Sequence, residues 1–256
     1  MKFIMQKSIT QTGLLSFIEK LIRRYILLYY FIRSIAIKFN IFEEDFKILK
    51  KIYGLKKINI IDIGASDGIS ANFFLKNLNV GSIFCYEPHT LYVNKLKKLK
   101  KKHSEIKIFN YGISKRNENI YVFVPLVKFF KKKLYLLTYT FYDYKDLCKQ
   151  LKLDFVNNHK FIIQKIKLSL RKFKLIKTKI DLIKIDVNGY EHQIVKSLER
   201  QILKDKPMLV LENNSKLQKT NNYLKKLGYE KFFTRNNNLF KHTNQNVLDI
   251  FFIYKK

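Results

Sequence analysis

A run of apolar residues that ends in a glycine turn and restarts as a helix constrains the fold of this chain most. Residues 58–63, INIIDI, are mostly apolar and β-branched, which is typical of a strand buried on both faces of a parallel sheet. GASDG follows at residues 64–68, and the pattern of residues 69–78, ISANFFLKNL, predicts a helix that starts near Ser66 or Asp67. A strand, a glycine turn and a helix N-terminus in succession form the ligand-binding corner of a doubly wound α/β fold.

The turn supplies groups that could surround a ligand. Gly64 and Gly68 let the backbone bend and would let a ligand approach with no Cβ in the way. Free N–H groups at the helix start attract negative charge. Asp62 places an acid inside the end of an apolar strand, where burial is costly without a partner. We therefore predict a ligand site that includes Asp62, Gly64, Ala65, Ser66, Asp67 and Gly68.

A second apolar run, SIFCYEPH at residues 82–89, ends in Glu87. It lies about 20 residues beyond the turn, where an acid at the tip of the second strand accepts hydrogen bonds from both hydroxyls of a ribose. The third strand is predicted at residues 105–114, EIKIFNYGIS, and its tip should lie beside the base. The predicted nucleoside site therefore also includes Glu87, Pro88, Asn110, Tyr111 and Gly112.

The composition of the turn selects among nucleosides. The dinucleotide motif G-x-G-x-x-G lacks its middle glycine here, and Asp67 would repel phosphates. There is no G-K-[ST] sequence either, which excludes a P-loop. S-adenosylmethionine fits these residues, because it has no phosphate, carries a sulfonium and an ammonium group, and keeps the ribose that Glu87 requires.

The remaining chain predicts the rest of the sheet. A fourth strand within residues 180–191, IDLIKIDVNGYE, ends at Asp186, and a fifth within residues 207–213 ends in Glu212. Residues 229–256 contain two strand-like runs separated by Asn-rich turns. Strands that alternate with helices favour a parallel sheet with right-handed crossovers. The predicted fold is α/β: a class I methyltransferase (Rossmann-like), mostly parallel sheet with a C-terminal antiparallel hairpin, plus N-terminal helices.

These segments resemble the FkbM family of S-adenosylmethionine-dependent methyltransferases over roughly residues 58–212. The resemblance rests on IDIGASDG, CYEPHT, DLIKIDVNGYEHQIVKSL and PMLVLE. The third of these resembles the family's Lys-Ile-Asp-Val-Glu-Gly-x-Glu block, and Lys184, Asp186, Gly189 and Glu191 stand at its matching positions. The resemblance implies methyl transfer to an oxygen, commonly a hydroxyl of a sugar or small natural product.

The same block supplies the predicted catalytic residues, which are Asp186, Glu191 and Lys184. Asp186 is the first candidate for a base near the acceptor hydroxyl and for a second contact to the cofactor, and Glu191 is the next candidate for the base. Two positions depart from the family pattern, since Asn188 replaces Glu, and Arg171, in LSLRKF, replaces an Asp. No His, Asp and Glu cluster has metal-site spacing, so we predict no required metal.

The predicted organisation is an N-terminal helical extension at residues 1–50 and a methyltransferase domain at residues 51–256. Within that domain, an insert at residues 121–179 mixes lysines with aromatics and is expected on the acceptor side. Residues 14–39 are basic and aromatic-rich. We expect them to be helices that pack on the domain; peripheral contact with the inner face of a membrane is the alternative. Their longest apolar stretch is far shorter than the ~20 residues that span a bilayer.

Charge and cysteine content leave further alternatives open. The chain has 51 Lys and Arg against 20 Asp and Glu, a net charge of +31, which suits nucleic acid or an acidic surface. The lysines are scattered, however, and a bias toward A/T-rich codons would produce the same excess. An RNA methyltransferase and a cofactor-binding protein without catalysis are the alternative functions. Two cysteines build no disulfide framework and favour a cytoplasmic setting. The sequence specifies no oligomeric state.

Overall fold

The computed structural model describes residues 44–129, 132–154, 161–214, 217–243, 245 and 247–255. The described residues form two compact units, one of residues 44–119 and 168–255 and the other of residues 120–167. The predicted helices before residue 44, including the segment proposed for membrane contact, lie outside the described residues. No helix in the described ranges is long and apolar enough to cross a membrane.

The larger unit is built on an eight-stranded sheet in the order β11-β10-β12-β9-β8-β1-β2-β3. Within this order, neighbours among β3, β2, β1, β8 and β9 pair in parallel. From β9 the sheet continues through β12, β10 and β11 in antiparallel pairs. This arrangement confirms the predicted mostly parallel sheet with an antiparallel C-terminal end. The strands are β1 (Ile58–Ile63), β2 (Val80–Tyr86), β3 (Ile106–Phe109), β8 (Leu182–Ile185), β9 (Met208–Glu212), β10 (Tyr229–Arg235), β11 (Asn238–Lys241) and β12 (Asp249–Tyr254).

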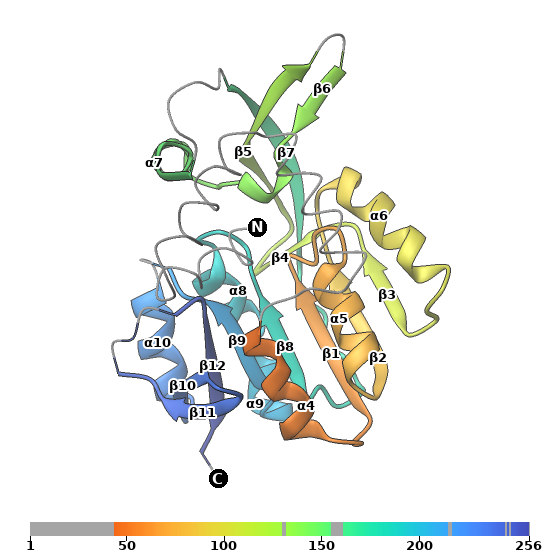
Figure 1. Ribbon diagram of the computed structural model, residues 1–256, viewed down its shortest axis with the longest axis vertical. Helices are drawn as coiled ribbons and strands as arrows, with labels where there is room; N and C mark the ends of the chain where they lie inside the picture. Colours follow the sequence, from red (N-terminus) through yellow and green to blue (C-terminus); the bar gives the residue numbers. More distant parts are fainter. Residues whose placement is uncertain are drawn as a thin grey trace. The chain divides into compact units, whose positions relative to one another are not determined.

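Helices cover both faces of this sheet, which explains why its central strands are apolar on both sides. In β1, Ile58 and Ile60 join one apolar cluster, and Ile61 and Ile63 join the other. The first cluster includes residues of α4, α5 and α6, and the second includes residues of α8, α9 and α10 (Figure 1). The helices are η2 (Glu44–Phe46), α4 (Lys47–Tyr53), α5 (Ile69–Asn77), α6 (Thr90–Lys100), α8 (Glu191–Ser197), α9 (Glu199–Asp205) and α10 (Leu217–Lys226).

Three boundaries differ from those predicted. The predicted third strand is divided, because β4 (Gly112–Ser114) leaves the large sheet and pairs with the end of β7 (Ile162–Lys172). The C-terminal hairpin gains β11 as an edge strand. The larger unit also begins before residue 50, since the ring of Phe46 is buried against Phe73, Phe74 and Phe251.

The smaller unit contains most of the predicted insert. It holds most of β5 (Glu118–Phe129), β6 (Lys132–Tyr135), η3 (Leu137–Tyr139), α7 (Tyr144–Asp154) and the first part of β7. Its apolar core consists of Leu136, Tyr139, Phe141, Leu147 and Leu151. The insert ends earlier than predicted, at residue 167, because the second part of β7 belongs to the larger unit. Its expected position over the acceptor stays a prediction.

Candidate active site

The loops after β1, β2 and β8 meet at one edge of the large sheet. From β1 the chain continues to β2 and β3 on one side and later returns to β8 and β9 on the other. Ligands of open α/β sheets bind at this reversal of strand order, outside the carboxyl ends of the strands. The structure thus places the turn at residues 64–68, Glu87 and Asp186 at one edge, as predicted.

Two backbone groups hold the carboxylate of Glu87 at the end of β2. The N–H of Ser66 donates to Oε2 at 2.9 Å, and the N–H of His89 donates to Oε1 at 2.8 Å. Burial raises the pKa of Glu87 to about 7, against the lowering effect of both hydrogen bonds. Each carboxylate oxygen can accept one more hydrogen bond. The group therefore has the capacity that two ribose hydroxyls need.

His89 lies beside Glu87 and was not among the predicted site residues. Its Nδ1 accepts a hydrogen bond from the N–H of Leu91 at 3.3 Å and so caps α6. That acceptor role assigns the ring proton to Nε2. Nε2 is buried and has no hydrogen-bond partner among the described residues. The signal in the sequence was the position of His89 directly after Glu-Pro, at the start of a helix.

The two glycines of the turn make room for the protein's own chain, in addition to the predicted bend of the backbone; their predicted contact with a ligand stays a prediction. A Cβ on Gly64 would lie 1.9 Å from the carbonyl oxygen of Asp186, and one on Gly68 would lie 2.9 Å from Leu96. Their φ angles of 73° and 85° are also in the left-handed region that glycine tolerates best. Both glycines are therefore needed for the turn and its packing, before any ligand is considered.

Asp62 and Lys184 form a buried ion pair beneath this turn. They are direct partners in the pairing of β1 with β8, so their side chains share a face of the sheet. The Nζ of Lys184 lies 3.5 Å from Oδ1 of Asp62 and 3.6 Å from Oδ2 of Asp186. The hydroxyl of Ser70 donates to the other oxygen of Asp62 at 2.6 Å. The partners that the sequence required for Asp62 are thus Lys184 and Ser70.

The side chains of Asp62, Lys184 and Asp186 differ in their exposure to solvent. The side chains of Asp62 and Lys184 are 0% and 9% exposed, whereas that of Asp186 is 20% exposed. Lys184 therefore connects a fully buried carboxylate to one that a ligand can reach. It contacts both acids and is placed to orient Asp186.

The remaining residues of the turn face in different directions. Ala65 is buried, and its N–H donates to the carbonyl of Tyr86 at 3.3 Å. The side chain of Asp67 is 2% exposed and lies 3.8 Å from Nζ of Lys95 in α6. Ser66 has a φ of 52°, which turns its N–H toward Glu87. A contact between Asp67 and the cofactor stays a prediction.

The predicted base-side residues lie next to Glu87. The amide of Asn110 donates to the carbonyls of Glu87 and Pro88, both at 3.2 Å. The guanidinium of Arg171 lies 4.7 Å from the centre of the Tyr111 ring. Arg171, one of the two departures from the family pattern, therefore covers an aromatic ring at this edge. A Cβ on Gly112 would approach Leu170 to 2.4 Å, which explains the glycine there.

The turn after β8 brings Glu191 close to Asp186. Glu191 is buried, and its Oε1 accepts the N–H of Gly189 at 3.0 Å. Burial raises the pKa of Glu191, and the charge of Asp186 raises it further. Asn188 has a φ of 51°, a conformation that Asn adopts more readily than most side chains. The second departure from the family pattern therefore has a local backbone explanation.

These residues fit S-adenosylmethionine. Glu87 and the Nε2 of His89 offer an acceptor and an unsatisfied buried donor, and the nearby acids suit a cation better than a phosphate. Glu87, His89 and Asn110 would hold the nucleoside, and Asp186 would face the positively charged end. Within the described ranges no group of three or more His, Cys, Asp or Glu side chains is arranged to hold a metal ion.

The fold and this site define a class I methyltransferase domain that uses S-adenosylmethionine. The family described as "Methyltransferase FkbM domain" matches residues 62–231. The chain belongs to that family, which confirms the resemblance drawn from its motifs. A search of curated proteins gives no match.

Several solved structures are similar to this chain. The methyltransferase FkbM from Methylobacillus flagellatus KT has a TM-score of 0.49 and 15% identity, over 77% of this chain and 44% of that one. The precorrin-6y C5,15-methyltransferase from Geobacter metallireducens GS-15 has a TM-score of 0.44 and 14% identity, over 84% and 89%. M. capricolum TrmK with S-adenosylhomocysteine has a TM-score of 0.38 and 13% identity, over 81% and 66%. This chain thus spans less than half of the Methylobacillus protein.

Proposed function

We propose that this protein methylates a hydroxyl oxygen of a glycan or small metabolite, with Asp186 as the general base. The observation that supports this most is the position of Asp186, a partly exposed carboxylate held by Lys184 at the carboxyl edge of β8. Hydroxyl groups are weak nucleophiles, and a positioned base adds typically ~10²–10⁴-fold to the rate.

The chain's residues divide the work of the reaction. S-adenosylmethionine, when bound, supplies a methyl group on a positively charged sulfur. Asp186 accepts the proton that the hydroxyl loses, and Lys184 keeps its carboxylate in place. Glu191, with its raised pKa, binds the turn through the N–H of Gly189 and is the weaker candidate for the base. Alignment of the reacting oxygen with the methyl group supplies much of the remaining rate.

Transfer of labelled methyl groups tests this proposal. The protein is incubated with methyl-labelled S-adenosylmethionine and a panel of monosaccharides, oligosaccharides and RNA, and products are identified by mass spectrometry. We expect O-methyl sugars, and Asp186→Asn should lower kcat ~10²–10⁴-fold at saturating cofactor. The matched control is Asp146→Asn, on α7 of the smaller unit. Label in RNA bases, or full activity of Asp186→Asn, would overturn the proposal.

A further inference from the structure

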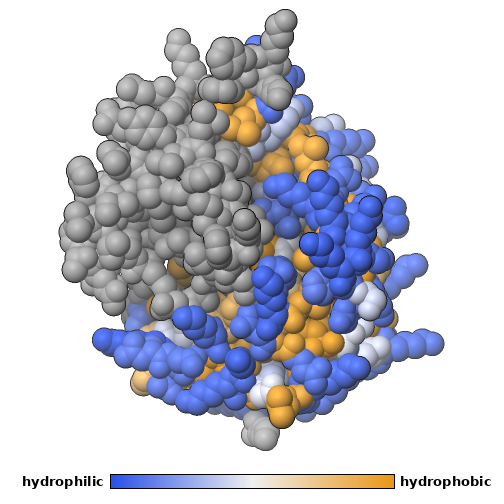
Figure 2. Space-filling model, turned by 45° about the vertical axis from the view of Figure 1, so that its right-hand side comes forward, coloured by the Kyte–Doolittle hydropathy of each residue, from blue (hydrophilic) through white to orange (hydrophobic). Residues whose placement is uncertain are grey.

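The lysines and arginines that give this protein its large positive charge are scattered along the sequence. On the side of the molecule that carries α6 and β3, many hydrophilic side chains lie between hydrophobic patches of the described surface (Figure 2). Lysines alone therefore do not indicate a binding site in this chain. A site requires lysines that converge from separate elements on a group that can itself bind.

Such a convergence exists around His192. Lys115 directly follows β4, Lys196 lies in α8 and Lys219 lies in α10. Both β4 and α10 pack against α8. The ring of His192 meets Tyr223 edge-on at 5.9 Å, and Nζ of Lys196 lies 5.6 Å from the centre of the same ring. We refer to Lys115, Lys196, Lys219 and His192 as the His192 cluster.

The three lysines of the cluster have no carboxylate partner among the described residues, unlike Lys56, Lys95 and Lys184. Burial lowers the pKa of His192, and the three lysines lower it further. Its Nδ1 is buried and makes no hydrogen bond to any described residue. The cluster therefore combines positive charge that meets no described carboxylate with a ring that has a buried, unused polar atom.

The cluster is next to the proposed catalytic residues. His192 directly follows Glu191, whose pKa responds to the charge of Asp186. β4 begins at Gly112, directly after the base-side residues Asn110 and Tyr111. The cluster therefore adjoins both the proposed catalytic residues and the base-side residues along the chain.

We propose that the His192 cluster binds an anionic group of the acceptor, so that the acceptor is an acidic sugar, with a phosphate or a carboxylate. This inference rests on the proposed function, because it assigns the substrate class of the same site. Lysine ammonium groups bind anionic oxygens by charge-assisted hydrogen bonds. A histidine N–H or an adjacent water can complete the contacts.

Direct binding tests the cluster without any methyl transfer. Protein with 15N-labelled histidine is titrated with inorganic phosphate, glucuronate and glucose, and the ring 15N shifts of His192 are followed. We expect saturable shifts with phosphate or glucuronate and none with glucose; the two anions separate a phosphate site from a carboxylate site. The triple variant Lys115→Gln/Lys196→Gln/Lys219→Gln should bind ~10-fold more weakly or worse.

The matched control removes the same charge elsewhere. Lys97, Lys98 and Lys100 are exposed lysines of α6, and their triple Gln variant should leave anion affinity unchanged. Equal losses in both variants would mean general attraction by net charge, and an unchanged His192 spectrum would mean no site; either result overturns the inference. Binding of an RNA oligonucleotide without binding of free phosphate or glucuronate would overturn it in favour of nucleic acid.

The outcomes also separate this inference from the proposed function. O-methylation of neutral and acidic sugars at equal kcat/KM would keep the proposed function and overturn the inference. Anion binding at His192 with no O-methyl product would keep the cluster as a binding site and overturn the proposed function.

Discussion

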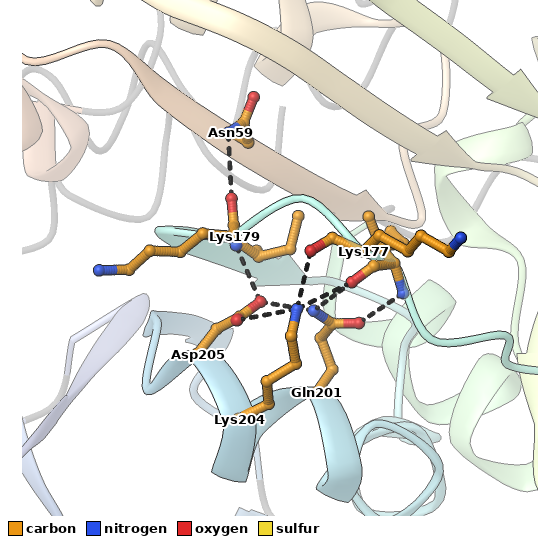
Figure 3. A network of polar contacts seen from close by, with 8 residues as sticks. Asn59, Lys177, Lys179, Gln201, Lys204 and Asp205 are labelled. Carbon is orange, nitrogen blue, oxygen red and sulfur yellow. Dashed lines mark hydrogen bonds and ion pairs between the residues drawn. The ribbon is translucent and has the colours of Figure 1, made fainter.

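Two polar networks at opposite edges of the large sheet differ in what satisfies their buried groups. At the amino edge, Gln201 accepts the N–H of Ile176 at 2.8 Å and donates to its carbonyl at 3.2 Å. Asp205 accepts the N–H of Ile180 at 2.9 Å, and Lys204 donates to two carbonyls at 3.1 and 3.0 Å (Figure 3). These side chains of α9 bind the backbone of the segment that leads into β8.

At the carboxyl edge the charged side chains bind mainly one another. Lys184 lies between Asp62 and Asp186, and the carboxylate of Glu87 accepts two N–H groups of loops. The amino edge therefore fixes a segment without regular secondary structure, and the carboxyl edge keeps accepting capacity for a ligand. A buried polar group indicates a ligand site only when the protein backbone leaves part of that group's hydrogen-bonding capacity unused.

The largest effect should come from breaking the carboxyl-edge network at Lys184. Lys184→Met leaves the carboxylate of Asp62 buried without its cation, and loss of one member of a buried ion pair costs about 3–5 kcal/mol. Urea titration should show this loss in the free energy of unfolding. Lys204→Met at the amino edge is the matched control, and with 37% of its side chain exposed it should cost about 1 kcal/mol or less.

A double variant separates charge from packing. Lys184→Met/Asp62→Asn removes both charges and should recover much of the lost stability. Equal losses for Lys184→Met and Lys204→Met would show that the two networks do not differ in the way described.

The strands of the larger unit were predictable because their signals are local. Apolar runs predicted β1, β2, β8 and β9. Glycine turns predicted the ends of β1 and β8, and Glu87 and Glu212 marked the ends of β2 and β9. The division between β3 and β4 was missed, because β4 pairs with β7 through contacts such as Gly112 with Leu170, which no local pattern specifies. The early start at Phe46 was missed because its packing partners lie far away along the chain.

The sequence predicted which residues form the candidate site better than it predicted the contacts between them. Glu87 and Asp186 are strand-end acids, which position alone identifies. Pairing of Asp62 with Lys184 depends on the register of β1 and β8, and local sequence does not set that register between distant parallel strands. The packing role of Gly64 was missed, because the close carbonyl of Asp186 is visible only in three dimensions.

An intermediate effect on stability should come from the amino edge at Gln201. Gln201→Leu leaves the N–H of Ile176 without its partner, which costs about 1–3 kcal/mol. Urea titration measures this loss, and calorimetric titration with S-adenosylhomocysteine should show unchanged affinity. Gln193→Leu on the exposed face of α8 is the matched control and should change neither quantity. A loss of cofactor affinity in Gln201→Leu alone would show that the two edges are coupled.

The smallest effect should be a pH dependence confined to the carboxyl edge. Burial raises the pKa of Glu87 to about 7, so the free protein protonates this group below that pH. For an acid with a raised pKa, the stabilising contribution is present at low pH and is lost as pH rises from about 4.5 to about 7. A ligand that donates hydrogen bonds to the carboxylate has the opposite preference. Its affinity should fall up to ~10-fold per pH unit below about 7 and level off above it.

Calorimetric titration with S-adenosylhomocysteine between about pH 5.5 and 8 measures this profile. Glu87→Gln should bind more weakly and lose the pH dependence, because the amide does not titrate and cannot accept both hydroxyl donors. Gln201→Leu should keep the wild-type profile, since its network lies at the other edge of the sheet. If the pH dependence persists in Glu87→Gln, another group is titrating. Glu191 is then the first residue to substitute, because burial also raises its pKa.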